Sequence, residues 1–383
     1  MRPNRIGRDV SLTAGSLPRT SDDKTPLPYW CPTGQDVRDV PLRHRAARRP
    51  PAPCPPDTPR PAHAPEPLRK VSAPLVEHRL DPVPDTVTDV FSADLPPVLS
   101  VDPGDSVVVR SLDASGHLER QRTPGEPRPL LIDERRGHCL AGPIEVRGAA
   151  PGMALAVRLD ALRPDGWGWT VAGGRDTPVN RRLGLVGSDP TWLLWELDAE
   201  QGTGTDQFGH TVPLAPFLGV IGMPPPEPGE HSTVPPRVFG GGNIDCRELV
   251  AGSTLFLPVT VEGALLCVGD GHAAQGDGEA SGTAIECGMT TRLTLDLVPE
   301  PALPTAYAVT PAGRVTFGFS PDLNEATGQA LEAMVTWLAA LLGLTPAAAL
   351  AVSSAAVQLR VTQVANETWG VHALLPEGAV RGR

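Results

Sequence analysis

Short apolar runs separated by turn residues dominate the chain from Val71 onward, and they restrict it to a fold built of strands. The stretches LPPVLSVDPGDSVVVRSLD, GPIEVRGAAPGMALAVRLDALRP and GSTLFLPVTVEGALLCVGD show the pattern. Their alternating or β-branched apolar residues are typical of strands, and PGD, PGM and EG are typical of tight turns. The 45 prolines and 40 glycines also favour short strands over long helical bundles. The sequence therefore predicts a mainly β fold, either a sandwich or a barrel.

Two helices are predicted near the C-terminus. Ser320 followed by Pro321 is typical of an N-cap and a first helical residue, and LNEATGQALEAMVTWLAALLG continues at helical spacing as far as Gly343. Thr345 and Pro346 repeat the same signal before AAALAVSSAA. VQLRVTQVAN and GVHALLP, which follow, have the pattern of strands. A smaller α+β portion is therefore expected after the β-rich body.

These patterns divide the chain into three parts. Residues 1–72 carry a proline every few positions, as in RHRAARRPPAPCPPDTPRPAHAPEPLRK, and lack a periodic apolar pattern. Such a segment cannot bury enough surface to offset its ordering entropy, so we predict a disordered tail. The alternatives are a proline-rich arm that binds a partner and a stretch that the working protein lacks. Residues 73–305 form the predicted β-rich body, and residues 306–383 form the α+β portion.

The net charge of −11 limits the classes of partner. The chain lacks a lysine and arginine stripe outside its N-terminal segment, so we expect no nucleic-acid partner. No apolar run approaches the roughly 18 to 20 residues of a membrane-spanning helix, and MRPNRIGRDV leads into no apolar signal region. We therefore expect no membrane partner and a soluble, cytoplasmic protein that acts on a small neutral molecule.

Six cysteines stand singly, without CxxC spacing, which predicts free thiols rather than a zinc ribbon or a disulfide framework. Most of them are expected to be small buried apolar residues. Cys139 beside His138 and Cys287 beside Glu286 could be activated nucleophiles, although adjacency in sequence does not establish that geometry. A serine triad is not supported, because the chain has no GxSxG motif around Ser232 or elsewhere.

The stretch GDGHAAQGDGEASGTAIECG concentrates acidic residues and a histidine among glycines and alanines. Asp270 and His272 are two residues apart, as are Asp277 and Glu279, and this spacing sends both members of a pair to one face of an extended strand. AAQG between the pairs could turn the chain back. Carboxylate and imidazole ligands suit zinc, calcium or a similar divalent ion. The alternative is a solvated acidic loop.

A second stretch, GMPPPEPGEHSTVPPRVFGGGNIDCREL, combines polar residues with unusual glycine and proline content. The glycines Gly240 to Gly242 could let backbone N–H groups approach a ligand or a developing oxyanion, although their ordinary use is turn geometry. His138, in RGHCLAGPIEV, is either a packed or surface histidine or a ligand.

Together these strings resemble a known family. The long segment from GVIGMPPPEPGEHST through DGHAAQGDGEASGTAIE is similar to the central signature of the acetamidase/formamidase family, and the resemblance extends from about Leu75 to Ala379. It implies a β-sandwich-like body with a smaller α+β portion. It also implies hydrolysis of short linear amides to a carboxylate and ammonia, with lactams as substrates of related proteins, and a divalent metal ion, zinc or calcium or both. A homodimer is expected from the family alone.

The resemblance also implies roles for particular residues. The implied metal ligands are His138, Asp245, Asp270, His272 and Asp277. The implied catalytic residues are Glu279 and Glu286, and His231 and Ser232 of GEHST are further catalytic candidates. Gly241, Gly242 and Asn243 of the GGGN turn are candidates for binding the amide or its oxyanion. One glutamate, Glu279 or Glu286, would transfer the proton from water to the departing nitrogen.

Three positions depart from the family's pattern. Thr88 and Asp89 stand where members commonly carry a His-Trp pair, and Gln358 stands where an aspartate often precedes the LRVTQV strand. These departures favour two alternatives to an active amidase. One is a catalytically weak protein that keeps the fold and binds a metal or a small molecule, and the other is a lactam hydrolase.

Overall fold

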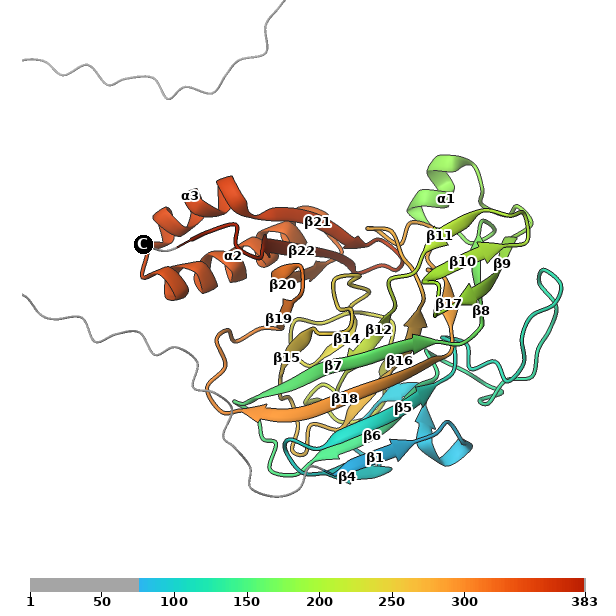
Figure 1. The fold of residues 1–383 in the computed structure, drawn as a ribbon, viewed down its shortest axis with the longest axis horizontal. Helices are drawn as coiled ribbons and strands as arrows, with labels where there is room; N and C mark the ends of the chain where they lie inside the picture. Colours follow the sequence, from blue (N-terminus) through green and yellow to red (C-terminus); the bar gives the residue numbers. More distant parts are fainter. Residues whose placement is uncertain (1–75, 382–383) are drawn as a thin grey trace, which may run out of the picture. The chain divides into compact units, whose positions relative to one another are not determined.

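The computed structural model describes residues 76–381, so the predicted disordered tail lies outside the described residues. Most strands of the described part belong to two large sheets, which confirms the mainly β prediction (Figure 1). The first sheet contains, in spatial order, β1 (Glu77–Leu80), β5 (Ser106–Ser111), β18 (Met289–Val298), β7 (Ala154–Pro164), β15 (Thr254–Pro258), β19 (Tyr307–Thr310), β20 (Gly313–Ser320), β22 (Trp369–Pro376) and β21 (Gln358–Gln363).

The second sheet follows a longer path and has a branch. Its main path contains β11 (Thr211–Pro213), β10 (Thr203–Asp206), β9 (Thr191–Asp198), β8 (Trp167–Ala172), β17 (Glu286–Cys287), β16 (Leu266–His272), β12 (Phe217–Gly222) and β14 (Gly241–Asn243). The branch contains β6 (Leu140–Val146), which pairs with β16, β2 (Val87–Thr88) and β4 (Leu99–Val101). A separate two-stranded sheet pairs β3 (Val90–Phe91) with β13 (His231–Ser232). β16 therefore pairs with three strands, β12, β17 and β6.

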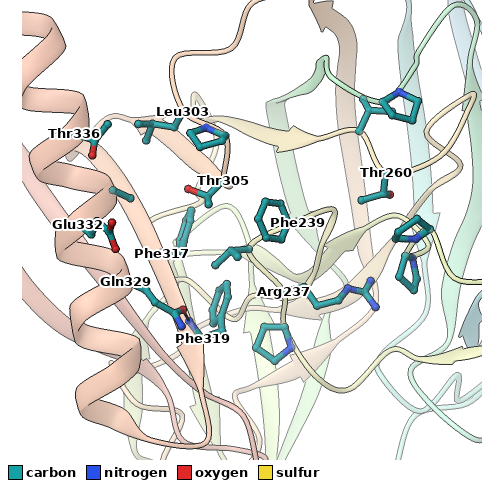
Figure 2. Close-up of a pocket in the computed structure, with 18 of the residues that line it drawn as sticks. Arg237, Phe239, Thr260, Leu303, Thr305, Phe317, Phe319, Gln329, Glu332 and Thr336 are labelled. Atoms are coloured by element: carbon teal, nitrogen blue, oxygen red, sulfur yellow. Dashed lines mark hydrogen bonds between the residues drawn. The ribbon is translucent and has the colours of Figure 1, made fainter.

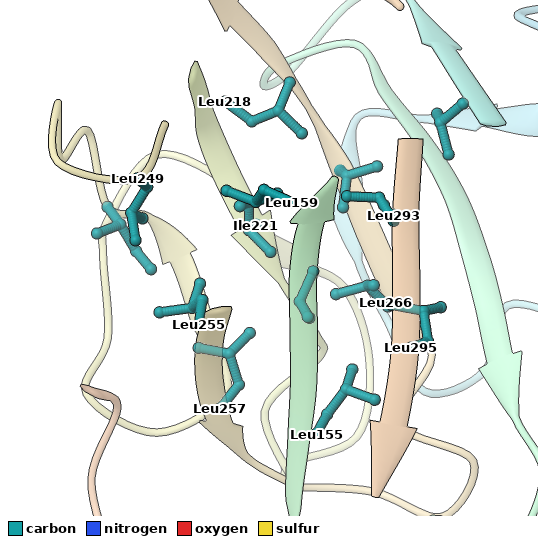
Figure 3. Close-up of a cluster of buried hydrophobic side chains, with 14 of the residues drawn as sticks. Leu155, Leu159, Leu218, Ile221, Leu249, Leu255, Leu257, Leu266, Leu293 and Leu295 are labelled. Carbon is teal, nitrogen blue, oxygen red and sulfur yellow. The ribbon is translucent and has the colours of Figure 1, made fainter. Parts of the chain in front are cut away.

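The main hydrophobic core combines residues of both large sheets (Figure 3). Leu155 and Leu159 of β7 and Leu293 of β18 come from the first sheet, whereas Leu218 of β12 and Leu266 of β16 come from the second. All five are almost completely buried. Two sheets that share one apolar interior form a sandwich-like body, as predicted.

Two helices near the C-terminus cover the strands β20 and β22 of the first sheet (Figure 1). α2 (Leu323–Leu342) approaches so closely that a Cβ on Gly318 of β20 would lie 2.8 Å from the backbone nitrogen of Ala330. Thr316 of β20 donates a hydrogen bond to the carbonyl of Ala330 at 2.7 Å. α3 (Pro346–Ala356) packs beside α2. The α+β portion continues the first sheet, because β19 pairs with β15 of the body.

The predicted ends of these helices are largely confirmed. Gly343 ends α2 in a left-handed conformation, and Thr345 caps α3 with Pro346 at its start. The start of α2 was predicted wrongly at Ser320, because β20 extends to that residue and Asp322 caps the helix instead. The hydroxyl of Ser320 accepts a hydrogen bond from the backbone nitrogen of Asp322.

Two further elements complete the described chain, the short helix α1 (Pro178–Leu183) after β8 and the 3-10 turn η1 (Pro84–Thr86) before β2. Within residues 76–381, no single helix has both the length and the apolarity of a membrane span. α2 and α3 reach these values only when taken together, and the chain bends by 109° between them.

Candidate active site

The end of β16 carries two of the predicted ligands, Asp270 and His272. Both side chains are buried, and His272 Nε2 lies 3.4 Å from Oδ1 of Asp270. Asp270 has a left-handed backbone with φ of 59°, which residues other than glycine rarely adopt. A Cβ on the adjacent Gly271 would lie 2.7 Å from the carbonyl oxygen of Cys287, so only glycine allows β17 to come this close. The string GDGH thus inserts a carboxylate and an imidazole into the interior of the sheet.

Gly219 of β12 organises the surroundings of this strand end. It lies between Leu218 and Val220, which pair with Gly271 and Gly269 of β16, and its carbonyl accepts a hydrogen bond from the backbone nitrogen of Asp245 at 3.2 Å. A Cβ on Gly219 would lie 2.7 Å from Oδ1 of Asp245 and 2.9 Å from Cε1 of His272, and closer still to the carboxylate of Asp270. The three side chains therefore meet in the space that the missing side chain leaves.

Two glutamates from other segments, Glu279 and Glu286, join Asp245, Asp270 and His272, and these five residues form the acidic cluster. Glu286 lies on β17 directly across from His272. Glu279 lies in the loop after β16 with a left-handed backbone, φ of 44°. The preceding Gly278 donates a backbone hydrogen bond to the carbonyl of Thr362, at the end of β21. The C-terminal portion therefore holds the loop that presents Glu279.

His272 is the common neighbour of the carboxylates. Its Nε2 lies 3.4 Å from Oε1 of Glu286, as it does from Oδ1 of Asp270. Its Nδ1 lies 2.9 Å from Oε1 of Gln275, whose amide nitrogen donates to the carbonyl of Asp245. This arrangement assigns a proton to Nδ1 and directs Nε2 toward the carboxylates.

Two groups of potential metal ligands share His272. Asp245, His272 and Glu279 form one group, and Asp270, His272 and Glu286 form the other, with ligand atoms within 4.8 Å of one another in each. Both carboxylate oxygens of Asp245, Nε2 of His272 and Oε2 of each glutamate are buried and have no hydrogen-bond partner among the described residues. Buried polar atoms without partners are rare in folded proteins. A divalent cation would satisfy them.

Electrostatics in the cluster favour the same conclusion. Burial, followed by repulsion between the carboxylates, raises the pKa of Asp245 and Glu279 well above their usual values. Burial raises the pKa of Glu286 to about 7. Burial also opposes the ionisation of Asp270, but the charge of His272 lowers the pKa of this carboxyl well below its usual value. Without a cation the cluster therefore retains protons that a bound metal ion would displace.

The cluster opens into a cavity of about 280 Å³. Asp270, Glu279 and Glu286 line it, together with His138 and Asn243. The side-chain oxygen of Asn243 is buried and has no hydrogen-bond partner among residues 76–381. Both the carboxylates and the unpaired amide oxygen are therefore available to a small polar molecule.

His138 occupies a defined orientation in this cavity. The hydroxyl of Thr233 accepts a hydrogen bond from the backbone nitrogen of His138 and lies 2.9 Å from Nδ1 of its ring. The hydroxyl can therefore donate to Nδ1, which leaves the proton of the neutral ring on Nε2. Nε2 lies 4.0 Å from Oδ2 of Asp270. Burial lowers the pKa of His138, so the ring is neutral near pH 7.

Several predicted site residues lie apart from the cluster. Asp277 is exposed, and the prediction that it shares a face with Glu279 is wrong because the chain turns at Gly278, where φ is 99°. His231 and Ser232 lie in the two-stranded sheet with β3 and do not line the cavity. Gly241 and Gly242 pair with β12 and also lie outside the cavity lining. A Cβ on Gly241 would lie 3.0 Å from Leu257, so tight packing explains this glycine.

The cysteines near the site are buried rather than activated. Burial raises the pKa of Cys139 to about 12 and that of Cys287 well above its usual value. Both thiols therefore stay protonated near neutral pH, and a thiolate nucleophile is disfavoured. The prediction of free, buried thiols is confirmed for the four cysteines within the described range.

The positions that depart from the family pattern do not line the cavity themselves. Gln358 is exposed at the start of β21. Thr88 and Asp89 are buried. The carboxylate of Asp89 accepts hydrogen bonds from the backbone of Arg136 at 2.6 Å and from its guanidinium at 3.2 Å. Because Arg136 lines the cavity, Asp89 affects the cavity indirectly, through its hydrogen bonds to Arg136.

Several residues of the site are not predicted from the sequence. Gly219 and Gln275 orient the cluster, and Arg135 and Arg175 line the cavity with Asn366, which follows β21. Of these residues, only Arg135 has a signal in the sequence, because it lies close before His138. The others become neighbours of the cluster through the fold.

A larger hollow of about 940 Å³ lies elsewhere, beside α2 (Figure 2). Phe239, Phe317, Phe319 and Leu303 contribute to its mainly apolar lining. It contains none of the predicted site residues, and the cationic group in its wall, Arg237, packs over the ring of Phe91. Its size therefore does not make it a candidate for the chemistry of the acidic cluster.

Sequence comparison identifies the family. The sequence model of the acetamidase/formamidase family matches residues 80–228 and 227–376, and the chain belongs to this family. An acetamidase of Mycolicibacterium smegmatis is 28% identical over 266 residues, which are 54% of this chain and 64% of that protein. A formamidase of Methylophilus methylotrophus is 28% identical over 237 residues, 49% of this chain and 57% of that protein. The chain spans less than two thirds of the length of the curated relatives it matches.

Structural comparison agrees. The crystal structure of an acetamidase from Bacillus halodurans is similar with a TM-score of 0.68 at 28% identity, covering 78% of this chain and 97% of that one. The family and the sandwich-like fold predicted from the sequence are thus confirmed.

Proposed function

We propose that the chain hydrolyses the C–N bond of small linear amides with the help of a divalent ion bound in the acidic cluster. The observation that carries this proposal is the group of unpaired, buried oxygen and nitrogen atoms at the end of a cavity of about 280 Å³. The names of the relatives, acetamidase and formamidase, supply the substrate class. Water adds to the acyl carbon, the C–N bond breaks, and the products are a carboxylate and ammonium.

The donor atoms fit a zinc ion better than a calcium ion. Both potential ligand groups contain His272, and imidazole nitrogen is a common zinc ligand, whereas calcium takes six to eight oxygen ligands. We assign the ion to Asp245, His272 and Glu279, because each of them has an unpaired ligand atom. When bound, such an ion would polarise the amide carbonyl and lower the pKa of water.

This assignment leaves Glu286 for proton transfer. Its Oε1 accepts a hydrogen bond from the backbone of Ala284, whereas Oε2 is unpaired, and the side chain lines the cavity. Burial raises the pKa of this carboxyl, so the group can hold a proton taken from water before it gives one to the departing nitrogen.

Asn243 and His138 are suited to hold the amide. The unpaired oxygen of Asn243 can accept a hydrogen bond from the substrate's NH₂ group. Nε2–H of His138 can donate to the carbonyl oxygen, where negative charge develops as the tetrahedral intermediate forms. Both side chains line the cavity, so one small amide can contact them together.

Ammonia release tests the proposal. Purified protein is assayed with formamide, acetamide, longer amides and lactams, before and after chelation and after zinc is restored. Turnover that disappears on chelation and returns with zinc is expected. Turnover that resists exhaustive metal removal would contradict the role of the ion, and turnover of lactams alone would replace the substrate class.

Two matched variants test the assigned roles. Glu286→Gln is expected to retain zinc and to lose turnover by roughly 100-fold or more, because proton transfer is removed. Asp245→Asn is expected to lose zinc as well as turnover. Zinc content by elemental analysis distinguishes them, and the opposite pattern would exchange the two roles.

A further inference from the structure

The cavity has opposite charges at its two ends. Asp270, Glu279 and Glu286 are buried, whereas three arginines that line the same cavity are exposed to solvent. They are Arg135, Arg136 and Arg175. The carboxylates therefore lie at the inner end and the guanidinium groups at the mouth. A neutral amide such as formamide has no group that would use these cations.

The three arginines differ in their partners. Arg136 forms ion pairs with Asp89 and Glu230, which balance its charge. Arg135 donates through Nη1 to the backbone carbonyls of Ala114 and Gly137 and has no carboxylate partner within residues 76–381. Arg175 likewise forms no ion pair within that range. Two guanidinium groups at the mouth thus remain free to bind an anion.

Space for a longer substrate is present. The cavity has a volume of about 280 Å³. Formamide has only three non-hydrogen atoms and would leave most of this space unfilled.

We propose that the preferred substrate is a short amide with a carboxylate on its acyl side, such as the monoamide of a dicarboxylic acid. Its carboxylate lies between Arg135 and Arg175 at the mouth, and its amide group lies beside Asn243 at the inner end. Guanidinium binds carboxylate through paired, charge-assisted hydrogen bonds. With the proposed divalent ion bound, the four buried carboxylates of the cluster still outweigh its charge, so the inner end repels the substrate's carboxylate and the two ends of the cavity select one orientation. This proposal rests on the proposed amidase activity and specifies its substrate.

Pairs of equal shape test the inference. Succinamate is compared with 4-methylpentanamide, and malonamate with 3-methylbutanamide, because an isopropyl group replaces the carboxylate at similar size. We expect kcat/KM for the anionic member to be higher by roughly tenfold or more, since a charged hydrogen bond contributes that much. The preference is expected to shrink as salt is raised, because the arginines are exposed.

Arginine variants then locate the effect. Arg135→Met and Arg175→Met are each expected to reduce the anionic-to-neutral ratio of kcat/KM by several-fold to tenfold. Arg163→Met is the control, because Arg163 is also exposed but pairs with Glu200 outside this cavity. The control is expected to leave the ratio unchanged.

The outcomes separate this inference from the proposed function. Turnover of neutral amides with no preference for their anionic partners overturns the inference and leaves the amidase activity standing. If no amide is hydrolysed, the amidase proposal fails, and calorimetric titration with succinamate decides the rest. Succinamate binding that each of Arg135→Met and Arg175→Met weakens by several-fold to tenfold supports the anion site. Binding that neither variant weakens, or no binding at all, overturns it.

Discussion

Two hollows in the described part of the chain differ in their lining as well as in their size. The larger, about 940 Å³, is lined mainly by apolar side chains such as Phe239 and Phe317 beside α2. The smaller, about 280 Å³, ends at buried ionisable groups that include Asp270 and Glu286. Apolar walls need no hydrogen-bond partners, whereas the second hollow leaves buried polar atoms without them. The unpaired buried groups, rather than the volume of a hollow, indicate which hollow is the candidate active site.

Backbone conformation also distinguishes the two hollows. Five described residues other than glycine have positive φ, and Asp245, Asp270 and Glu279 are three of them. Such conformations each cost on the order of 1 kcal/mol and persist where the surrounding structure enforces them. No residue in the lining of the larger hollow has this feature. Three of the five strained residues therefore belong to the acidic cluster, and strain of this kind is common at functional sites.

Removing a strained carboxylate should separate activity from stability most strongly. Asp270→Gly is expected to reduce turnover by roughly 1000-fold, because the cluster loses the carboxylate that lies beside His272. Its melting temperature should change little, since relief of the left-handed backbone offsets the loss of a carboxylate whose ionised form His272 stabilises. Ala264→Gly, at φ of 62°, is the control for the backbone alone. A large loss of stability in Asp270→Gly would contradict the idea of stored strain.

Crowding the cluster should be almost as harmful. Gly219→Ala would place a methyl group against the carboxylates of Asp245 and Asp270, and we expect turnover to fall by about 100-fold as the reacting groups shift. Gly276→Ala, in the loop after β16, meets no atom within 4 Å and is the matched control. Equal activity in the two variants would show that the cluster tolerates the displacement that the methyl group forces.

A buried carboxylate behind the wall of the acidic cavity should make the stability of the protein depend on pH. Asp113 is buried behind Trp169, accepting hydrogen bonds from its indole at 2.7 Å and from the ring of His117 at 2.8 Å. Burial opposes its ionisation, but these hydrogen bonds lower the pKa of Asp113 below its usual value. A depressed pKa gives stability that is present above the unfolded value, about 3.9, and is lost as pH falls through the folded value.

Asp113→Asn therefore tests that contribution. It is expected to reduce the free energy of unfolding at pH 7 by about 2 kcal/mol and to flatten its decline below pH 4. Urea denaturation across this pH range provides the measurement. Asp102→Asn, at an exposed ion pair, is the control and should change little. If the free energy of unfolding of Asp113→Asn declines below pH 4 as steeply as that of the unchanged protein, other groups cause the loss of stability in acid.

Filling the larger hollow should have the smallest effect. Thr336→Leu adds apolar volume to its exposed side, and we expect changes within about 0.5 kcal/mol in stability and twofold in amide turnover. A loss of turnover comparable with that of Gly219→Ala would mean that the two hollows communicate, and the contrast drawn between them would fail.

The sequence predicted the strands well because their signal is local. Apolar alternation and turn residues place β5, β7 and β16 without knowledge of their partners. The start of α2 was missed because Ser320 still pairs with β22, a long-range contact. In the site, GDGH and Asn243 stood out by composition, whereas Asp277 was misplaced because a period-two pattern cannot reveal a turn at Gly278. The arginines at the mouth required the fold to bring three segments together.

Gly219 has a consequence for mutational scanning. Replacement by alanine deletes atoms at nearly every other position, so the usual result is a shorter side chain and a void beside it. At Gly219 the same replacement inserts a methyl group among three ionisable side chains. A scan that passes over glycines would never sample the position on which the spacing of the cluster depends, and one that includes it would report an obstruction rather than a deletion.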